Sequence, residues 1–378
     1  MTRRERLLAT LRGAPVDRPP VSFYEITGME NTSPDDPFNI FADPSWAPLI
    51  DLARAHTDRI VMRKVAYASI TPDPLEGLSH NTTWLEGESR FTRREVRAGG
   101  RVLTCRSRRD RDVNTVWTEE HLLKDLDDLR AFLDVPLPAS DGAVDPSDVL
   151  EAEATLGDTG IVMIDTPDPL CLAASLFSMA DYTTLALTEP DWFRKLLDRF
   201  AESLAPKIEA GARALPGRLW RIYGPEYATP PFLPPACFRD YVCRYVRPMI
   251  DAIHRSGGYA RIHAHGRIGQ VLDDICAMGA DAIDPIEPPP QGDVLLHDVR
   301  RRYGRQLVLF GNLEITDLEN LPTPRFAEVV KRSLAAGTSG EGRGFVLMPS
   351  ACPYGRTLSA LALRNYETMV ELATGAAY

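Results

Sequence analysis

The sequence has little of what marks several special classes of protein. Its 378 residues contain no apolar run near the ~18 residues that a membrane helix needs, and no basic block that would bind a nucleic-acid backbone. The formal net charge is −10, and the six cysteines include no C-x-x-C pair. Cysteines this sparse do not make a disulfide scaffold. We therefore expect a cytoplasmic protein that binds neither membranes nor nucleic acids.

A glycine-rich G-x-G-x-x-G turn is also missing after every strand-like run. Its absence argues against an open, doubly wound sheet that binds a dinucleotide, which is the main alternative α/β architecture. The chain begins instead with a short helical extension. Thr2 and Glu5 have the spacing of a capping box, ahead of Leu7, Leu8 and Leu11.

Apolar runs and helical patterns alternate strictly after residue 158. The apolar runs cover residues 160–165, 219–223, 259–263, 280–284, 306–310 and 344–348. Helical spacing covers 190–214, 235–256, 271–278, 294–302, 324–335 and 358–373. Strand-like runs at 21–25 and 58–62 bring the number of strands to eight, which closes a parallel barrel. We predict an α/β fold with one (β/α)₈ TIM-barrel domain over residues 1–378.

Residues 64–156 depart from this alternation and are predicted to be an excursion between the second and third strands. Polar and β-prone residues alternate on both sides of Gly99-Gly100, a pattern that predicts a β-hairpin with a two-residue turn.

Polar residues follow nearly every predicted strand. In such barrels the chemistry lies at the carboxyl ends of the strands. The residues at these ends are Glu25, Arg63, Lys64, Asp165, Glu226, His263, His265, Asp284, Glu287, Asn312, Glu314, Ser350 and Cys352. This polar ring favours an enzyme over a binding or scaffold module.

His263 and His265 form a candidate metal site with Cys352. Residues i and i+2 of a strand point to the same side, so both imidazoles can reach one ion. Imidazole and thiolate are good zinc ligands, and three protein ligands with one open position define a catalytic zinc. Glu226 is a candidate fourth ligand. Alternatively, the histidines only form hydrogen bonds and Cys352 is an ordinary buried thiol.

Several motifs resemble the uroporphyrinogen decarboxylase superfamily. They are residues 4–13 with Asp17-Arg-Pro-Pro-Val, His263-Ala-His265-Gly, Gly311-Asn-Leu-Glu, Gly344-Phe-Val-Leu-Met with Cys352, and the closing residues 365–371. The resemblance covers most of the chain and is weakest at 64–118. It implies a (β/α)₈ barrel. The superfamily contains porphyrinogen decarboxylases and methyltransferases that work with corrinoid proteins.

The chain is more similar to the methyltransferase branch. Decarboxylases have an arginine-containing stretch where this chain has Tyr24-Glu-Ile-Thr-Gly-Met, an aspartate segment where it has Met62-Arg-Lys-Val, and a histidine in place of Cys352. The methyltransferases bind zinc through His-x-Cys-Gly and a later cysteine. His263 and Cys352 match that motif, whereas His265 replaces its middle cysteine.

An imidazole in place of a thiolate removes one negative charge, so a His-His-Cys zinc would be the stronger Lewis acid. The resemblance therefore implies zinc-dependent methyl transfer between a small methyl donor, with O-methyl favoured, and a corrinoid (cobalamin) cofactor or corrinoid protein. Thiol methylation is the next possibility. Two alternatives stay open: a non-catalytic small-ligand barrel, and a decarboxylase (a carboxy-lyase). The arginines available to a decarboxylase are Arg63, Arg221, Arg261 and Arg267.

Other strand-end residues have candidate roles around the metal. Glu226 and Glu287 are candidate acid–base groups, or carboxylates that only orient the histidines. Tyr24, Tyr223 and Asn312 are predicted to line the substrate pocket, although aromatic residues at a barrel mouth often serve only packing.

Overall fold

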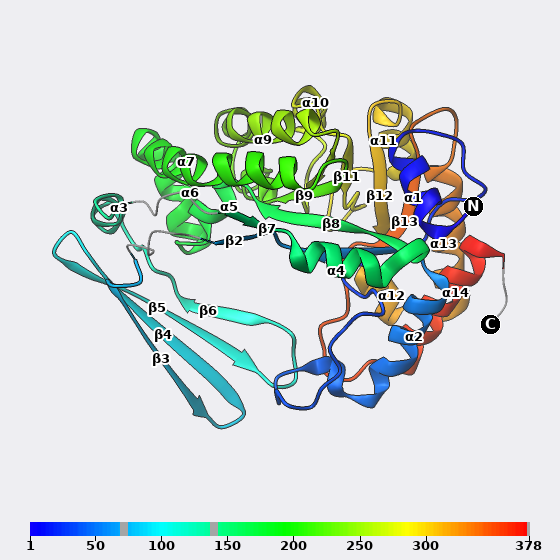
Figure 1. Ribbon diagram of the computed structural model, residues 1–378, viewed down its shortest axis with the longest axis horizontal. Helices are drawn as coiled ribbons and strands as arrows, with labels where there is room; N and C mark the ends of the chain where they lie inside the picture. Colours follow the sequence, from blue (N-terminus) through cyan, green and yellow to red (C-terminus); the bar gives the residue numbers. More distant parts are fainter. Residues whose placement is uncertain (69–74, 137–142, 376–378) are drawn as a thin grey trace.

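The computed structural model describes residues 1–68, 75–136 and 143–375. It is an α/β fold in which helices lie along the outer side of a curved parallel sheet, and a separate antiparallel sheet projects to one side (Figure 1). The strand order of the parallel sheet is β1-β8-β9-β10-β11-β12-β13. These strands are β1 (Arg59–Arg63), β8 (Gly160–Pro167), β9 (Leu219–Tyr223), β10 (Tyr259–His263), β11 (Ala282–Asp284), β12 (Val308–Leu313) and β13 (Phe345–Pro349).

The α-helices follow the predicted alternation from β8 onward, and α7 has the predicted bounds. They are α1 (Arg3–Leu11), α2 (Ala47–His56), α3 (Leu126–Leu133), α4 (Ser147–Leu156), α5 (Pro169–Ala174), α6 (Met179–Thr188), α7 (Pro190–Ala214), α8 (Pro235–Phe238), α9 (Arg244–Arg255), α10 (Leu272–Ala277), α11 (Leu296–Tyr303), α12 (Ile315–Asn320), α13 (Thr323–Gly337) and α14 (Ala360–Thr374). Among the helices so described, none is long and apolar enough to cross a membrane.

The strand predicted at residues 21–25 is reduced to one isolated bridge, so the eight-strand count is not confirmed. Val21 pairs with Leu347 of β13, and its carbonyl accepts a hydrogen bond of 2.7 Å from the N–H of Asp58, next to β1. This segment therefore lies where an eighth strand would lie. Pro19 and Pro20 precede it, and proline has no N–H with which to extend a ladder.

The excursion between β1 and β8 is larger than the expected hairpin. Four antiparallel strands follow one another in sheet order: β3 (Ser79–Glu86), β4 (Ser89–Ala98), β5 (Arg101–Asp110) and β6 (Val116–Glu120). Gly99 and Gly100 connect β4 to β5 with φ angles of 53° and 79°, which glycine adopts without strain. A second small sheet pairs β2 (Ala66–Ala68) with β7 (Ala143–Asp145).

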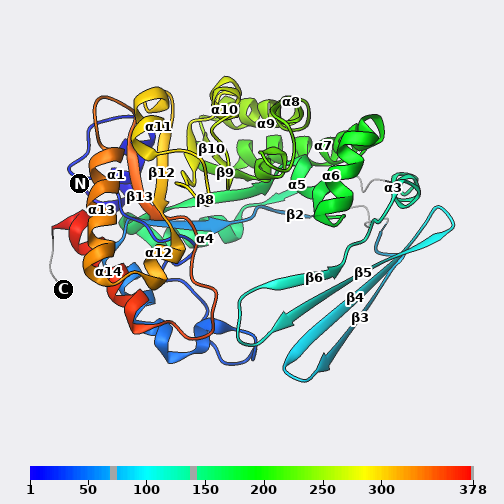
Figure 2. The same ribbon diagram turned by 180° about the vertical axis from the view of Figure 1, so that it is seen from behind.

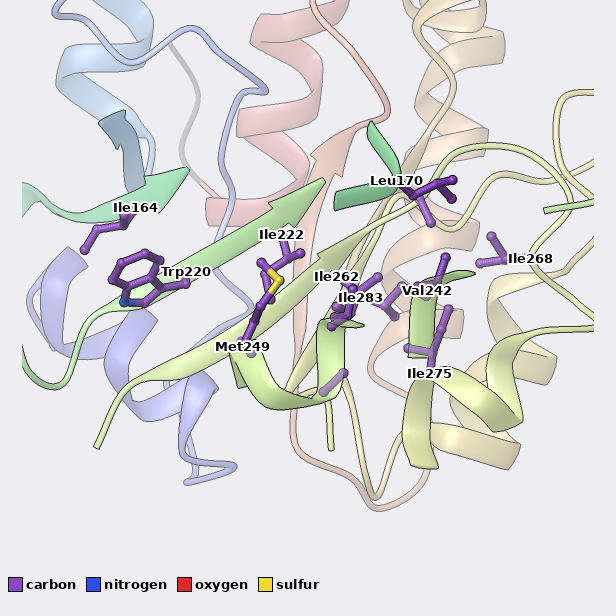
Figure 3. Packing of buried hydrophobic residues seen from close by; sticks show 14 of the residues in the cluster. Ile164, Leu170, Trp220, Ile222, Val242, Met249, Ile262, Ile268, Ile275 and Ile283 are labelled. Carbon is purple, nitrogen blue, oxygen red and sulfur yellow. The ribbon is translucent and has the colours of Figure 1, made fainter. Parts of the chain in front are cut away.

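Successive side chains of each parallel strand point to opposite faces of the sheet, so the hydrophobic core has two layers. One layer lies between the sheet and the helices, and the other lies on the inner side of the curved sheet. In β9, Trp220 and Ile222 face outward and pack beneath the helices, together with Ile262 of β10 and Met249 of α9 (Figure 3). Leu219 faces inward, where the lower part of the interior is apolar and Leu7 of α1 reaches it. The inward positions become polar only toward the carboxyl ends of the strands, which is where the site lies.

Candidate functional site

Four charged side chains cross the interior at neighbouring inward positions of β8 to β11. Asp165 lies opposite Arg221 in the strand register, and Arg221 lies opposite Arg261. The Nε atom of Arg221 donates to Asp165 Oδ1 at 2.6 Å, and Nη2 of Arg261 donates to Asp284 Oδ2 at 2.6 Å. Each buried guanidinium is thus neutralised by its own carboxylate, as buried charges require.

His263 is the next inward residue of β10 after Arg261, and it is buried. Its Nδ1 lies 2.9 Å from Asp284 Oδ2. Burial alone would raise the pKa of Asp284, but Arg261 and His263 together hold that pKa below its ordinary value. Because an ionised carboxylate only accepts hydrogen bonds, Nδ1 is the donor, which leaves Nε2 as the ring atom that could bind a ligand.

Tyr24 lies beside His263 on this Nε2 side. Its hydroxyl is 3.5 Å from Nε2, and the two rings stack with centroids 5.9 Å apart. The same hydroxyl accepts a hydrogen bond from Nη1 of Arg221. Burial raises the pKa of Tyr24, so the hydroxyl stays protonated. The structure therefore places Tyr24 beside His263, and its role as a pocket residue stays a prediction.

His265 lies against His263, with ring centroids 4.7 Å apart and planes at 90°. Its Nδ1 is 2.8 Å from Glu287 Oε1, while Glu287 Oε2 accepts a 2.6 Å hydrogen bond from the N–H of Gly266. Burial disfavours a charged His265, but the hydrogen bond and charge of Glu287 outweigh this and raise the pKa of His265. Both histidines are therefore oriented through Nδ1 by a carboxylate, His263 by Asp284 at the end of β11 and His265 by Glu287 in the loop that follows.

Cys352 makes a different contact from the predicted one. Its thiol donates to Oε2 of Glu25 at 3.5 Å, and burial together with the charge of Glu25 raises the pKa of the thiol. In the part of the chain that the structure describes, no three His, Cys, Asp or Glu side chains are grouped to hold a metal. The two histidines are brought together, whereas Cys352 is bonded to Glu25, so the three-ligand set stays a prediction.

Two other segments contact the loop that carries Cys352: Glu25 accepts the hydrogen bond from the thiol, and Asn114 bonds the loop backbone. Glu25 has a φ of 60°, and it is the one non-glycine residue among those described with a positive φ. Such a conformation has to be imposed by the surroundings and is frequent at functional sites. On the other side, Asn114 donates from its N–H to the Tyr354 carbonyl at 2.6 Å. The turn between β5 and β6 therefore borders the Cys352 loop.

Two buried polar groups lie at the carboxyl end of β12. Burial, with the charge of Glu287 added, raises the pKa of Glu314 to about 7. One carboxylate oxygen of Glu314 and the amide oxygen of Asn312 are buried with no hydrogen-bond partner among the described residues. Unpaired buried polar atoms are costly, so both are groups that a substrate could satisfy. Asn312 was predicted as a pocket residue, whereas Glu314 was noted only for its place at a strand end.

The remaining predicted residues lie at the carboxyl end of β9: Tyr223 is its last residue, and Glu226 is on the loop that follows. The guanidinium of Arg221 lies 5.5 Å from the ring centroid of Tyr223, and burial raises the pKa of Tyr223 to about 12. Glu226 accepts a 3.1 Å hydrogen bond from the N–H of Gly224. Nearby Asp168 is fully buried, and burial, with the charge of Glu226 added, raises its pKa well above the ordinary value.

The ion pairs Arg221–Asp165 and Arg261–Asp284 were not predicted from the sequence. The sequence suggests Arg221 and Arg261 only as possible anchors for substrate carboxylates. In the structure both are ion-paired, Arg63 pairs with Asp148 at 3.3 Å, and Arg267 is exposed. A sequence signal for these pairs did exist, because an arginine at an inward strand position is acceptable only beside a carboxylate.

The chain belongs to the family described as uroporphyrinogen decarboxylase (URO-D), which it matches over residues 162–374. A uroporphyrinogen decarboxylase of Neisseria meningitidis is 28% identical over 172 residues, which are 43% of this chain and 44% of that protein. The match thus spans less than half of the relative's length. A methyltransferase from Methanosarcina mazei has a similar fold, with a TM-score of 0.59 and 15% identity over the whole of both chains.

Proposed function

We propose that this protein is a methyltransferase that moves a methyl group between a small donor, preferably an O-methyl compound, and a corrinoid cofactor or corrinoid protein. One observation carries the proposal. The imidazoles of His263 and His265 lie side by side, and each is hydrogen-bonded through Nδ1 to a carboxylate. Zinc-bound histidines have this arrangement, since the carboxylate sets the tautomer and orients the ring.

The donor set suits zinc in its chemistry, although Cys352 bonds to Glu25 in this structure. His263 and His265 would hold the ion through Nε2, and Cys352 would join them after leaving Glu25. When bound, zinc would act as a Lewis acid toward the methyl donor. The chain itself supplies orientation through Asp284 and Glu287.

Glu314 is the proposed proton donor for the alcohol that leaves when an O-methyl bond is cleaved. Its pKa of about 7 lets it carry a proton at neutral pH and release it again. Neutral Asn312 and Tyr24 would contact the substrate. Glu226 stays a candidate for a fourth ligand or an acid–base group.

The decarboxylase alternative requires arginines that are free to hold several substrate carboxylates. Arg221 and Arg261 already bind Asp165 and Asp284. A porphyrinogen would have to compete with these buried carboxylates. This consideration favours methyl transfer, even though the matched relative from Neisseria is a decarboxylase.

Metal analysis of protein purified without a histidine tag tests the ligands. We expect about one zinc per chain, and loss of metal with a normal circular dichroism spectrum in His263→Ala and Cys352→Ala, because both ligands lie at the barrel mouth and not in the apolar core. Cys276→Ala, on α10 and away from the mouth, is the matched control and should keep its metal. Unchanged metal content in both ligand variants would refute the site.

The reaction class is tested by the spectral change from cob(I)alamin to methylcobalamin. The donors to compare are methoxylated aromatics, methanol, methylamines and methylthiols. We expect turnover with an O-methyl donor, its loss on chelation, and no decarboxylation of uroporphyrinogen. Porphyrinogen turnover that chelators leave unchanged would establish the decarboxylase instead.

A further inference from the structure

The inserted sheet ends in an edge strand that points away from the barrel. Strand β3 (Ser79–Glu86) pairs only with β4 in the part of the chain that the structure describes. Figure 1 and the opposite view in Figure 2 both show β6 on the barrel side of this sheet and β3 on the far side. Residues 80–83 are exposed. The backbone groups along the outer edge of β3 therefore face solvent.

This edge lacks the features that keep edge strands from pairing. Natural edges are short or carry lysine, proline, a bulge or an inward charge. Strand β3 has eight residues, Ser-His-Asn-Thr-Thr-Trp-Leu-Glu, with no lysine, arginine, proline or glycine. The arginines are placed on the two inner strands instead, at Arg90, Arg93, Arg94, Arg97, Arg101, Arg106, Arg108 and Arg109. The outermost strand is thus the one left without protection.

The hairpin register determines which residues of β3 direct their backbone groups outward. The two-residue turn at 87–88 closes on Glu86 opposite Ser89, and the pair beside such a turn is hydrogen-bonded. Hydrogen-bonded pairs then alternate along β3. The residues whose N–H and C=O groups point away from β4 are Ser79, Asn81, Thr83 and Leu85.

We propose that β3 pairs with β3 of a second copy of this chain, antiparallel about a two-fold axis at Thr82, to form one continuous eight-stranded sheet. In this register Asn81 faces Thr83 of the second copy, and Ser79 faces its Leu85. Asn81 and Thr83 then exchange both backbone hydrogen bonds across the axis. The N–H of Ser79 already donates to the Glu76 carbonyl at 3.4 Å, so Ser79 offers its carbonyl to Leu85 of the second copy. Thr82 faces its own equivalent. A two-fold axis requires such self-complementarity.

A second copy fits this edge better than a charged partner does. No carboxylate or arginine lies between residues 79 and 85, so the pairing brings no like charges opposite one another. Some of the arginines behind the edge are paired within the sheet itself: Arg93 bonds Glu95 at 3.0 Å, and Arg106 bonds Glu119 at 2.9 Å. Strand β3 itself has no arginine or lysine with which to bind an acidic protein or a nucleic acid.

Disulfide trapping tests the register. Cα atoms of a directly opposite, non-hydrogen-bonded pair are about 4.5 Å apart, which lies within the range of about 4.4–6.8 Å for a disulfide. Mild oxidation of Thr82→Cys should therefore give a linked dimer on a non-reducing gel. Thr83→Cys is the matched control and should give no more dimer than oxidised wild type, because its equivalent is offset along the strand. Equal or stronger linkage through position 83 overturns the proposed pairing.

Light scattering and sedimentation test the dimer itself without any cross-link. The wild type should be a dimer at micromolar concentration. Thr83→Pro removes an N–H that points away from β4, so the backbone ladder between β3 and β4 is kept while the pairing is lost. Thr83→Pro and Thr83→Val both remove the 3.3 Å contact between the hydroxyls of Thr83 and Thr92, so the comparison between them isolates the N–H. This variant should be a monomer with a wild-type circular dichroism spectrum, and Thr83→Val should stay dimeric. A monomeric wild type, or a Thr83→Pro variant that stays dimeric, refutes the proposal.

Discussion

Replacing Glu314 by glutamine tests the effect of burying one carboxyl group at the carboxyl end of β12. The side chain keeps its shape but can no longer ionise. Burial raises the pKa of Glu314 from 4.5 to about 7. Between these two pKa values the folded protein holds a proton that the unfolded chain has released. The free energy of unfolding of the wild type therefore falls as the pH rises through this range.

The size of the effect follows from the difference between the two pKa values. At about 1.36 kcal/mol per unit, the rise to about 7 costs the ionised wild type about 3 kcal/mol above pH 7, most of which is lost between pH 5 and pH 8. Glu314→Gln avoids this loss. Its free energy of unfolding relative to wild type should therefore increase by about that amount across the window.

The measurement is urea unfolding of metal-free wild type and variant at several pH values from 5 to 8. Infrared titration should in addition show a protonated carboxyl band that disappears near pH 7 in wild type only. Glu341→Gln is the control, because Glu341 is exposed and pairs with Arg305 at the surface. If the unfolding profiles of wild type and Glu314→Gln run parallel, the carboxyl ionises in the folded state at its ordinary pKa and the burial argument fails.

Three further substitutions test the site and the core. Asp284→Asn should weaken zinc binding about 10–100-fold by releasing His263 and should destabilise the fold by about 3–5 kcal/mol by leaving Arg261 unpaired; wild-type values in chelator competition and urea unfolding would contradict both. His265→Cys should still bind zinc but turn over O-methyl donors more slowly, and a faster rate would refute the Lewis-acidity argument. Trp220→Ala should cost about 3–5 kcal/mol in urea unfolding, and a cost below 1 kcal/mol would show a loosely packed outer layer.

Local periodicity was enough to predict most strands of the parallel sheet and the helices between them. The pattern over residues 190–214 predicted α7 at its observed bounds, because a helix repeats every 3.6 residues and its apolar stripe is visible in one segment. Segments 160–165 and 219–223 were predicted as strands for the corresponding reason, and they form β8 and β9. The strand predicted at residues 21–25 is reduced to one bridge at Val21. Its β-prone residues do not show whether a strand on each side is close enough to pair with it.

The sequence by itself determined the alternation of strands and helices from β8 onward and the polar residues at the strand ends, since both depend on neighbours along the chain. Only the tertiary structure decided the partners within that ring. Arg221 meets Asp165 across 56 positions, and Cys352 meets Glu25 across 327. The closing of the sheet and the register of its strands bring such residues together. The pKa of Glu314 likewise depends on burial, which residues distant in the chain create.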